Sequence, residues 1–194
     1  SIELDGREIT KLPSSKRDLA MVFQSYALYP HMDLYENMAF GLKLAKVPKA
    51  EIQKRVARVA DVLQIEALLD RKPGALSGGQ RQRVAIGRAL VRDVDVFLFD
   101  EPFGALDEIT RERLNDELLR LFQIEGFAGL FITHSIAEAV YMSTKVLVMS
   151  ARPGQIVGSF DIPFSYPRAH SLRYEPKFAE ICGEVSLALR GALV

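Results

Sequence analysis

Apolar residues follow two different patterns along this chain. Residues 34–45 predict a helix, and residues 49–63 predict a second, amphipathic helix in which apolar residues recur every three or four positions from Pro48 onward. The apolar stripe of that second helix consists of Ile52, Val56, Val59 and Leu63. The stretch RKPG at residues 71–74 then interrupts the helical pattern.

The second pattern is the short, continuous apolar run, typical of a strand in a parallel sheet that is covered on both faces. Helices are predicted at 107–126, ending at Gly126, and at 135–142. The runs lie at 19–24, 96–100, 129–133 and 145–149. Strand and helix alternate, which predicts an α/β fold with a parallel sheet.

This alternation also predicts how the chain is organised. Residues 1–29 and 93–194 would form the α/β core, and the helical residues 30–92 would be an all-α subdomain inserted into it. The opening SIELDGREI predicts a hairpin with a two-residue Asp5-Gly6 turn. Because the chain begins directly in this hairpin, and with Ser1, we expect further residues upstream.

Two adjacent glycines stand at the start of a predicted helix, in ALSGGQRQRVAIGRAL at residues 75–90. Glycine is unfavourable in a helix, so Gly78 and Gly79 indicate a sharp turn or a close approach. Ser77 and Gln80 have the spacing of a capping box, which explains only a helix start. The same geometry also suits an anion, because a helix N-terminus offers free N–H groups and a positive dipole end.

Polar residues end several of the apolar runs. They are Gln24, Asp100, Glu101 and His134. Ligands of open α/β sheets bind beyond the carboxyl ends of the strands, and paired carboxylates can hold a metal through water and accept a proton from an attacking water. The alternatives are a polar turn at residues 100–102 and a structural histidine, because Ser135 and Glu138 have the spacing of another capping box.

Composition narrows the choice of partners. With 194 residues, 48% of them hydrophobic, the chain can bury a sizeable core. Its 25 basic and 25 acidic residues cancel, so no net charge attracts it to nucleic acid or anionic lipid. The single Cys182 excludes an internal disulfide and suits a reducing compartment. The apolar runs are too short to span a bilayer.

Five motifs in a fixed order make the chain similar to a known family. They are MVFQ at 21–24, LSGGQ at 76–80, VFLFDE at 96–101, GALD at 104–107 and ITH at 132–134. In this order they resemble the Q-loop, signature motif, Walker B strand, D-loop and switch histidine of ABC transporter ATP-binding subunits. The resemblance implies a P-loop NTPase (RecA-like) fold and an ATPase that couples ATP hydrolysis to solute import.

The resemblance implies a role for each motif residue. Asp100 and Gln24 would hold Mg²⁺, and Gln24 would also sense the nucleotide. Glu101 would polarise the attacking water, and His134 would contact the γ-phosphate of ATP. The remaining nucleotide-binding residues would be Ser77, Gly78, Gly79, Gln80 and Asp107. The signature residues would act on the nucleotide of a second copy, in a homodimer that encloses two ATP molecules.

One part of the family pattern is absent. The phosphate-binding loop G-x-x-x-x-G-K-[ST] does not occur in these residues, and neither does the dipeptide Gly-Lys. We therefore expect that loop upstream, an N-terminally truncated core, and no ATP hydrolysis by this chain alone.

The resemblance also implies partners at the membrane. The stretch SYALYPHM places Tyr26, Leu28, Tyr29 and Met32 where a transmembrane permease subunit would dock, although a hydrophobic staple within the chain is the alternative. The protein would then lie on the cytoplasmic face of the membrane, in an importer that includes a solute-binding protein, and would bind no nucleic acid.

The type of importer differs between the two halves. Residues 25–52 are similar to carbohydrate importers, whereas residues 100–122 and 146–160 are more similar to nitrate, sulfonate, taurine or pyrimidine-precursor importers. Because these residues do not include the β-rich regulatory domain of the carbohydrate type, we expect the second group. Two other hypotheses stay open, a soluble ABC ATPase of DNA repair or translation and an inactive fragment that only dimerises or docks.

Overall fold

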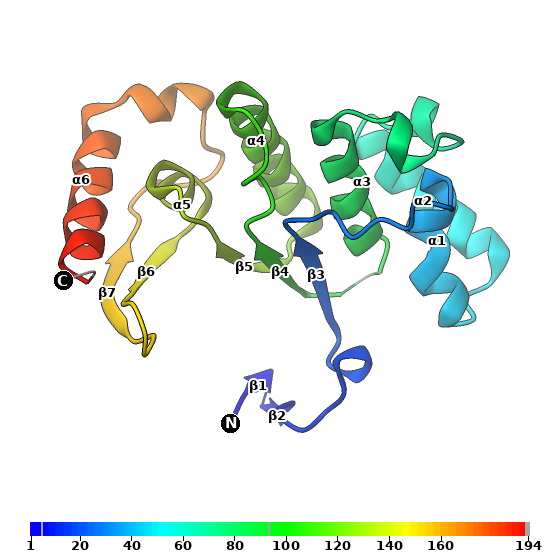
Figure 1. Cartoon of the computed structure of the whole chain (residues 1–194), viewed down its shortest axis with the longest axis horizontal. Coiled ribbons are helices and arrows are strands. Elements are labelled where there is room, and N and C mark those ends of the chain that lie inside the picture. Colours follow the sequence, from blue (N-terminus) through cyan, green and yellow to red (C-terminus); the bar gives the residue numbers. More distant parts are fainter. Residues whose placement is uncertain (5, 93, 193–194) are drawn as a thin grey trace. The chain divides into compact units, whose positions relative to one another are not determined.

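The computed structural model describes residues 1–4, 6–92 and 94–192 (Figure 1). They fall into two compact units. The first unit comprises Ser1–Pro102 and Gly126–Leu130, and the second comprises Phe103–Glu125 and Phe131–Val194. Within these described ranges, every helix is too short or too polar to cross a bilayer.

The first unit opens with the predicted hairpin. Strands β1 (Glu3–Leu4) and β2 (Arg7–Glu8) are antiparallel, with Glu3 opposite Glu8. Gly6 has a φ of +73°, which suits glycine at this turn. The other predicted turn residue, Asp5, lies outside the described residues. A short 3-10 helix, η1 (Ser14–Lys16), follows.

The predicted parallel pairing is confirmed. Strand β3 (Leu19–Phe23) pairs in parallel with β4 (Val96–Asp100), so that Phe23 lies opposite Asp100. With β5 (Ala128–Ile132) they form a sheet of strand order β3-β4-β5. A parallel pair requires a long crossover connection, and the helices between β3 and β4 provide it.

The side chains of these strands differ in their burial. The buried side chains are those of Ala20, Val22, Phe97 and Phe99. On β3 the alternate side chains of Met21 and Phe23 are 39% and 41% exposed, and on β5 Leu130 is 58% exposed. Within the first unit β3 therefore buries alternate side chains only, and cover on both faces stays a prediction.

Three helices of the first unit pack against one another (Figure 1). They are α1 (Leu34–Leu44), α2 (Lys49–Val62) and α3 (Gly78–Leu90). The predicted stripe of α2 is buried in this packing. At the contact, a Cβ on Gly87 would lie 3.0 Å from both Leu63 Cδ1 and Met38 Cε, so a larger residue here would require these side-chain ends to shift. That residues 30–92 form a subdomain apart from the α/β core stays a prediction.

Local signals place the ends of these helices. Asp33 caps α1, because its Oδ1 accepts from the Glu36 N–H at 2.6 Å and the Glu36 carboxylate accepts from the Asp33 N–H at 3.3 Å. Pro48 precedes α2 as its N-cap residue. Between α2 and α3 lie two 3-10 turns, η2 (Glu66–Leu68) and η3 (Pro73–Ala75), the second of which begins in the predicted RKPG break.

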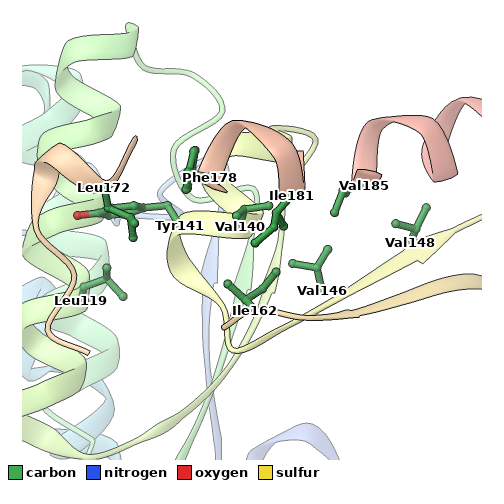
Figure 2. Packing of buried hydrophobic residues seen from close by; sticks show 10 residues of the cluster. All are labelled: Leu119, Val140, Tyr141, Val146, Val148, Ile162, Leu172, Phe178, Ile181 and Val185. Carbon is green, nitrogen blue, oxygen red and sulfur yellow. The ribbon is translucent and has the colours of Figure 1, made fainter. Parts of the chain in front are cut away.

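The second unit has a core of its own, shown in Figure 2. Its side chains come from α4 (Glu108–Glu125), α5 (Ile136–Met142), β6 (Lys145–Met149), η4 (His170–Tyr174) and α6 (Pro176–Gly191), and from Ile162 just after β7 (Ile156–Asp161). The cluster consists of Leu119, Val140, Tyr141, Val146, Val148, Ile162, Leu172, Phe178, Ile181 and Val185. The predicted α4 and α5 are confirmed, and the sequence analysis missed β7 and α6.

The apolar run at 145–149 predicts a further strand of the parallel sheet. Strand β6 forms there, but it does not join that sheet. It pairs with β7 in an antiparallel two-stranded sheet, with Lys145 opposite Asp161. The connection between them is a short turn in which the Ser150 N–H donates to Gln155 O at 2.8 Å. So short a connection allows only antiparallel pairing.

Candidate active site

Two carboxylates stand at the end of β4. Asp100 is the last residue of the strand and Glu101 follows it. Glu101 has a φ of +44°, in the left-handed region that costs a non-glycine residue roughly 1–3 kcal/mol. Backbone strain of this kind clusters at functional sites. Nothing in the local sequence predicts this backbone angle.

Gln24 reaches the same place from β3. The parallel register sets Phe23 opposite Asp100, so the residues that follow the two strands are neighbours. The Gln24 Nε2 donates to Glu101 Oε2 at 3.3 Å, across 77 residues of sequence. The structure thus brings together Gln24, Asp100 and Glu101, which the sequence analysis had placed at the ends of separate strands.

The chemistry of these three side chains fits Mg²⁺ bound with phosphates. Mg²⁺ prefers oxygen ligands and is commonly held by one or two carboxylates, with water and substrate phosphates completing its shell. Asp100 offers a carboxylate and Gln24 an amide oxygen. No cluster of three or more His, Cys, Asp or Glu residues suited to a metal occurs in the part of the chain that the structure describes.

The capping box at Ser77 is confirmed. The Ser77 hydroxyl accepts from the Gln80 N–H at 3.3 Å, and Gln80 Oε1 accepts from the Ser77 N–H at 3.0 Å. Gly78 and Gly79 are the first two residues of α3, and the positive-φ glycines among the described residues are Gly6 and Gly126. The backbone angles at 78 and 79 therefore do not require glycine, and the close approach of another group stays a prediction.

Asp107 belongs to the second unit and caps α4. Its Oδ1 accepts from the Thr110 N–H at 3.0 Å, and this hydrogen bond lowers the pKa of the Asp107 carboxyl. An aspartate at this position stabilises a helix start. The side chain is exposed, so it is also accessible to another molecule.

His134 follows β5 in the second unit and is exposed. Ser135 caps α5 by accepting from the Glu138 N–H at 3.4 Å, but the reciprocal half of the predicted capping box is absent. The physical reason is that Glu138 is only 5% exposed, so its carboxylate is buried instead of lying over the start of the helix. This burial raises the pKa of the Glu138 carboxyl.

The segment 25–32 after Gln24 is more tightly held than a surface loop. Tyr29 is 37% exposed, and its ring lies 4.8 Å from that of Phe40. Its backbone N–H donates to Asn37 Oδ1 at 2.7 Å, and its carbonyl accepts from Asn37 Nδ2 at 3.1 Å. The sequence analysis missed Asn37, which is fully buried; its position on a buried helix face was the available signal.

Comparison with known proteins places this arrangement in a family context. The family model described as "ABC transporter" matches residues 1–104. The chain is 48% identical over 164 residues to the oligosaccharides import ATP-binding protein MsmX of Bacillus subtilis, a match that covers 84% of this chain and 45% of MsmX. It is 52% identical over 148 residues to the sn-glycerol-3-phosphate import ATP-binding protein UgpC of Bordetella avium, covering 76% of this chain and 41% of UgpC.

A solved structure is also similar. It is cbiO1 from Clostridium perfringens, part of the ABC transporter complex cbiONQ, with a TM-score of 0.69 and 27% identity over 89% of this chain and 64% of that one. The likeness confirms the predicted α/β fold of the P-loop NTPase class. The chain spans less than half the length of the curated relatives it matches.

Proposed function

Since the chain belongs to the ABC transporter family, we propose that it is part of an ATP-hydrolysing subunit that drives solute import through a transmembrane permease. The observation that carries this proposal is the Gln24–Glu101 hydrogen bond at the carboxyl end of the β3–β4 pair. It joins an amide and a carboxylate from distant motifs at the edge of the sheet where ligands bind.

The side chains divide the chemistry between them. When bound, Mg²⁺ neutralises the charge of the ATP phosphates, and Asp100 and the Gln24 amide oxygen are the groups that hold it. Glu101 Oε2 accepts the proton of the water that attacks the γ-phosphorus. His134 contacts the γ-phosphate and orients it.

The residues of the signature motif act on a second copy of the protein. Ser77, Gly78, Gly79 and Gln80 form a capped helix start that suits a phosphate. In a homodimer this helix start contacts the γ-phosphate held by the partner, and Asp107 lies in the same interface. The absence of side chains at 78 and 79 allows the backbone N–H groups to approach the phosphate directly.

The partners follow from the proposed importer. The permease docks near Tyr26, Leu28, Tyr29 and Met32, which holds the subunit on the cytoplasmic face of the membrane. A solute-binding protein delivers the solute to the permease. Relatives whose names specify the import of oligosaccharides and sn-glycerol-3-phosphate support an importer.

The function is tested by comparing the full-length protein with residues 1–194. Full-length protein is expected to hydrolyse ATP when Mg²⁺ is present and to lose this activity with EDTA. Residues 1–194 alone are expected to show none, because the phosphate-binding loop provides most phosphate contacts in such enzymes. Steady Mg²⁺-dependent hydrolysis by residues 1–194 would contradict the second expectation, and an inactive full-length protein would contradict the function.

The docking site is tested by Tyr29→Asp in the full-length protein. A charge at this partly exposed ring should abolish transport and co-purification with the permease, while ATP hydrolysis of the isolated subunit persists and Tm falls by no more than roughly 4 °C. Tyr174→Asp, at a tyrosine that is 74% exposed, is the matched control.

Phe40→Ala separates docking from the alternative, a hydrophobic staple within the chain. It removes the ring that Tyr29 packs against but leaves Tyr29 itself in place. If the staple were the main role, Phe40→Ala and Tyr29→Asp would both lower Tm strongly and leave the permease complex intact.

A further inference from the structure

Two successive residues of the segment after Gln24 have an unfavourable backbone. Tyr26 has a φ of +60° and Ala27 a φ of +47°. Left-handed angles are costly for residues with a Cβ and persist only where the surroundings hold them. Two local hydrogen bonds help, from the Tyr26 N–H to Phe23 O at 3.2 Å and from the Ala27 N–H to Ser25 O at 2.7 Å. Neither carbonyl of the strained pair takes part in these local bonds.

Arg88 of α3 supplies donors to both of those carbonyls. Its Nη1 donates to Ala27 O in a short hydrogen bond, and its Nη2 donates to Tyr26 O at 3.3 Å. The guanidinium carbon also lies 6.0 Å from the centre of the Tyr29 ring. A planar, forked guanidinium can bond two neighbouring carbonyls at once, which a lysine ammonium cannot do in the same geometry.

The charge of Arg88 strengthens this contact, because hydrogen bonds from a charged donor are stronger than neutral ones. The Arg88 side chain is half-buried, and this burial lowers the pKa of its guanidinium. At the far end of the same segment, buried Asn37 holds the backbone of Tyr29. Residues 26–29 are thus held from two helices.

Arg88 also connects two parts of the proposed site. It lies on α3, eleven positions after Ser77, so a rigid helix joins it to the capped glycine start. The carbonyls that it holds come two and three residues after Gln24, whose amide contacts Glu101. Coupling between sites travels through contiguous packed groups and rigid elements of this kind.

We propose that Arg88 is a positioning residue, which sets Gln24 against Glu101 by holding the left-handed Tyr26–Ala27 backbone and so links Gln24 to helix α3. The expected effect on catalysis rests on the proposed function. The hydrogen bonds from Arg88 to the carbonyls of Tyr26 and Ala27, which we call the backbone clamp, do not. No covalent step is involved. Displacement of α3 at its Ser77 end would shift the Gln24 segment through these two hydrogen bonds.

The test measures both the backbone and the activity of the full-length protein. Arg88→Lys is expected to increase hydrogen exchange at the Tyr26, Ala27 and Tyr29 amides by on the order of tenfold, and to lower kcat for ATP by a similar factor with KM little changed. Ala27→Gly should reverse both effects in the double variant, because glycine adopts the left-handed angle without help. Ala27 is exposed, so this change alters backbone preference and not packing.

Two further variants distinguish loss of the backbone contact from a general folding defect. Ala27→Val leaves Arg88 intact but makes the left-handed angle harder to adopt, so it should reproduce the exchange increase. Arg92→Lys is the matched control, because Arg92 Nη1 also donates to a backbone carbonyl, that of Leu19 at 3.1 Å, in a strand without a left-handed residue. It should leave exchange at residues 26–29 unchanged.

The outcomes separate the inference from the proposed function. Unchanged exchange in Arg88→Lys, or a defect that Ala27→Gly does not reverse, would overturn the positioning role. A full-length protein with no ATP hydrolysis would overturn the proposed function alone. The hydrogen-exchange measurements would still test whether Arg88 holds the backbone of Tyr26 and Ala27.

Discussion

Replacement of Glu101 by glutamine in the full-length protein is expected to slow ATP hydrolysis by on the order of a hundredfold or more. Glutamine has the size of glutamate but cannot accept the proton of the attacking water. Both residues have the same backbone preference, so the cost of the +44° φ at this position is unchanged. The substitution therefore removes the base and leaves the geometry.

The measurements are kcat, ATP affinity and the oligomeric state with ATP bound. ATP affinity should stay near that of the wild type. The ATP-bound dimer should accumulate, because its dissociation depends on ATP hydrolysis. Glu66→Gln, an exposed glutamate in η2, is the control for a lost carboxylate outside the site. If the Glu101→Gln variant kept the wild-type kcat, Glu101 would be only a turn residue.

A positive charge at Ser77 is expected to inactivate the site of the partner subunit. Ser77→Arg places a long cation at the start of α3, where the backbone is proposed to contact the partner's phosphate. In homodimers of this variant ATP hydrolysis should be lost. In mixed dimers with subunits that lack the lysine of the phosphate-binding loop, one composite site keeps all its parts, so activity should partly return.

The control for this experiment is Ser77→Ala. It removes the cap hydrogen bond, whose loss costs roughly 0.5–2 kcal/mol of stability, but adds no charge. It should therefore lose much less activity than Ser77→Arg while losing similar stability. Zero recovery in every mixture of Ser77→Arg subunits with lysine-deficient subunits would indicate that Ser77 acts only within its own chain.

The sequence alone determined the features that depend on neighbouring residues. The apolar stripe of α2 and the capping box at Ser77 are set by residues three or four positions apart, and α4 ends at Glu125, just before the predicted Gly126. Each of these signals acts within one turn of helix, where side-chain spacing and cap hydrogen bonds dictate the backbone. The parallel pairing of β3 and β4 was also predictable, because helices separate the two apolar runs.

Other features were decided only by the tertiary structure. The apolar run of β6 is indistinguishable by composition from those of β3 and β4, yet its short connection to β7 makes it antiparallel. The exposure of Met21 and Phe23 depends on which elements cover the strand. An apolar run indicates a strand but carries no information about its partner or its cover.

The candidate site shows the same division. Motif order and residue type identified Gln24, Asp100 and Glu101, because each stands where a strand ends. Two contacts could not be predicted in this way, because they join positions 61 to 77 residues apart. They are the hydrogen bond of Gln24 with Glu101 and the hydrogen bonds of Arg88 with the carbonyls of residues 26 and 27. The left-handed angle of Glu101 was not predicted either. The local sequence does not predict these features, because the hydrogen bonds that stabilise them form only once the sheet and helices have packed.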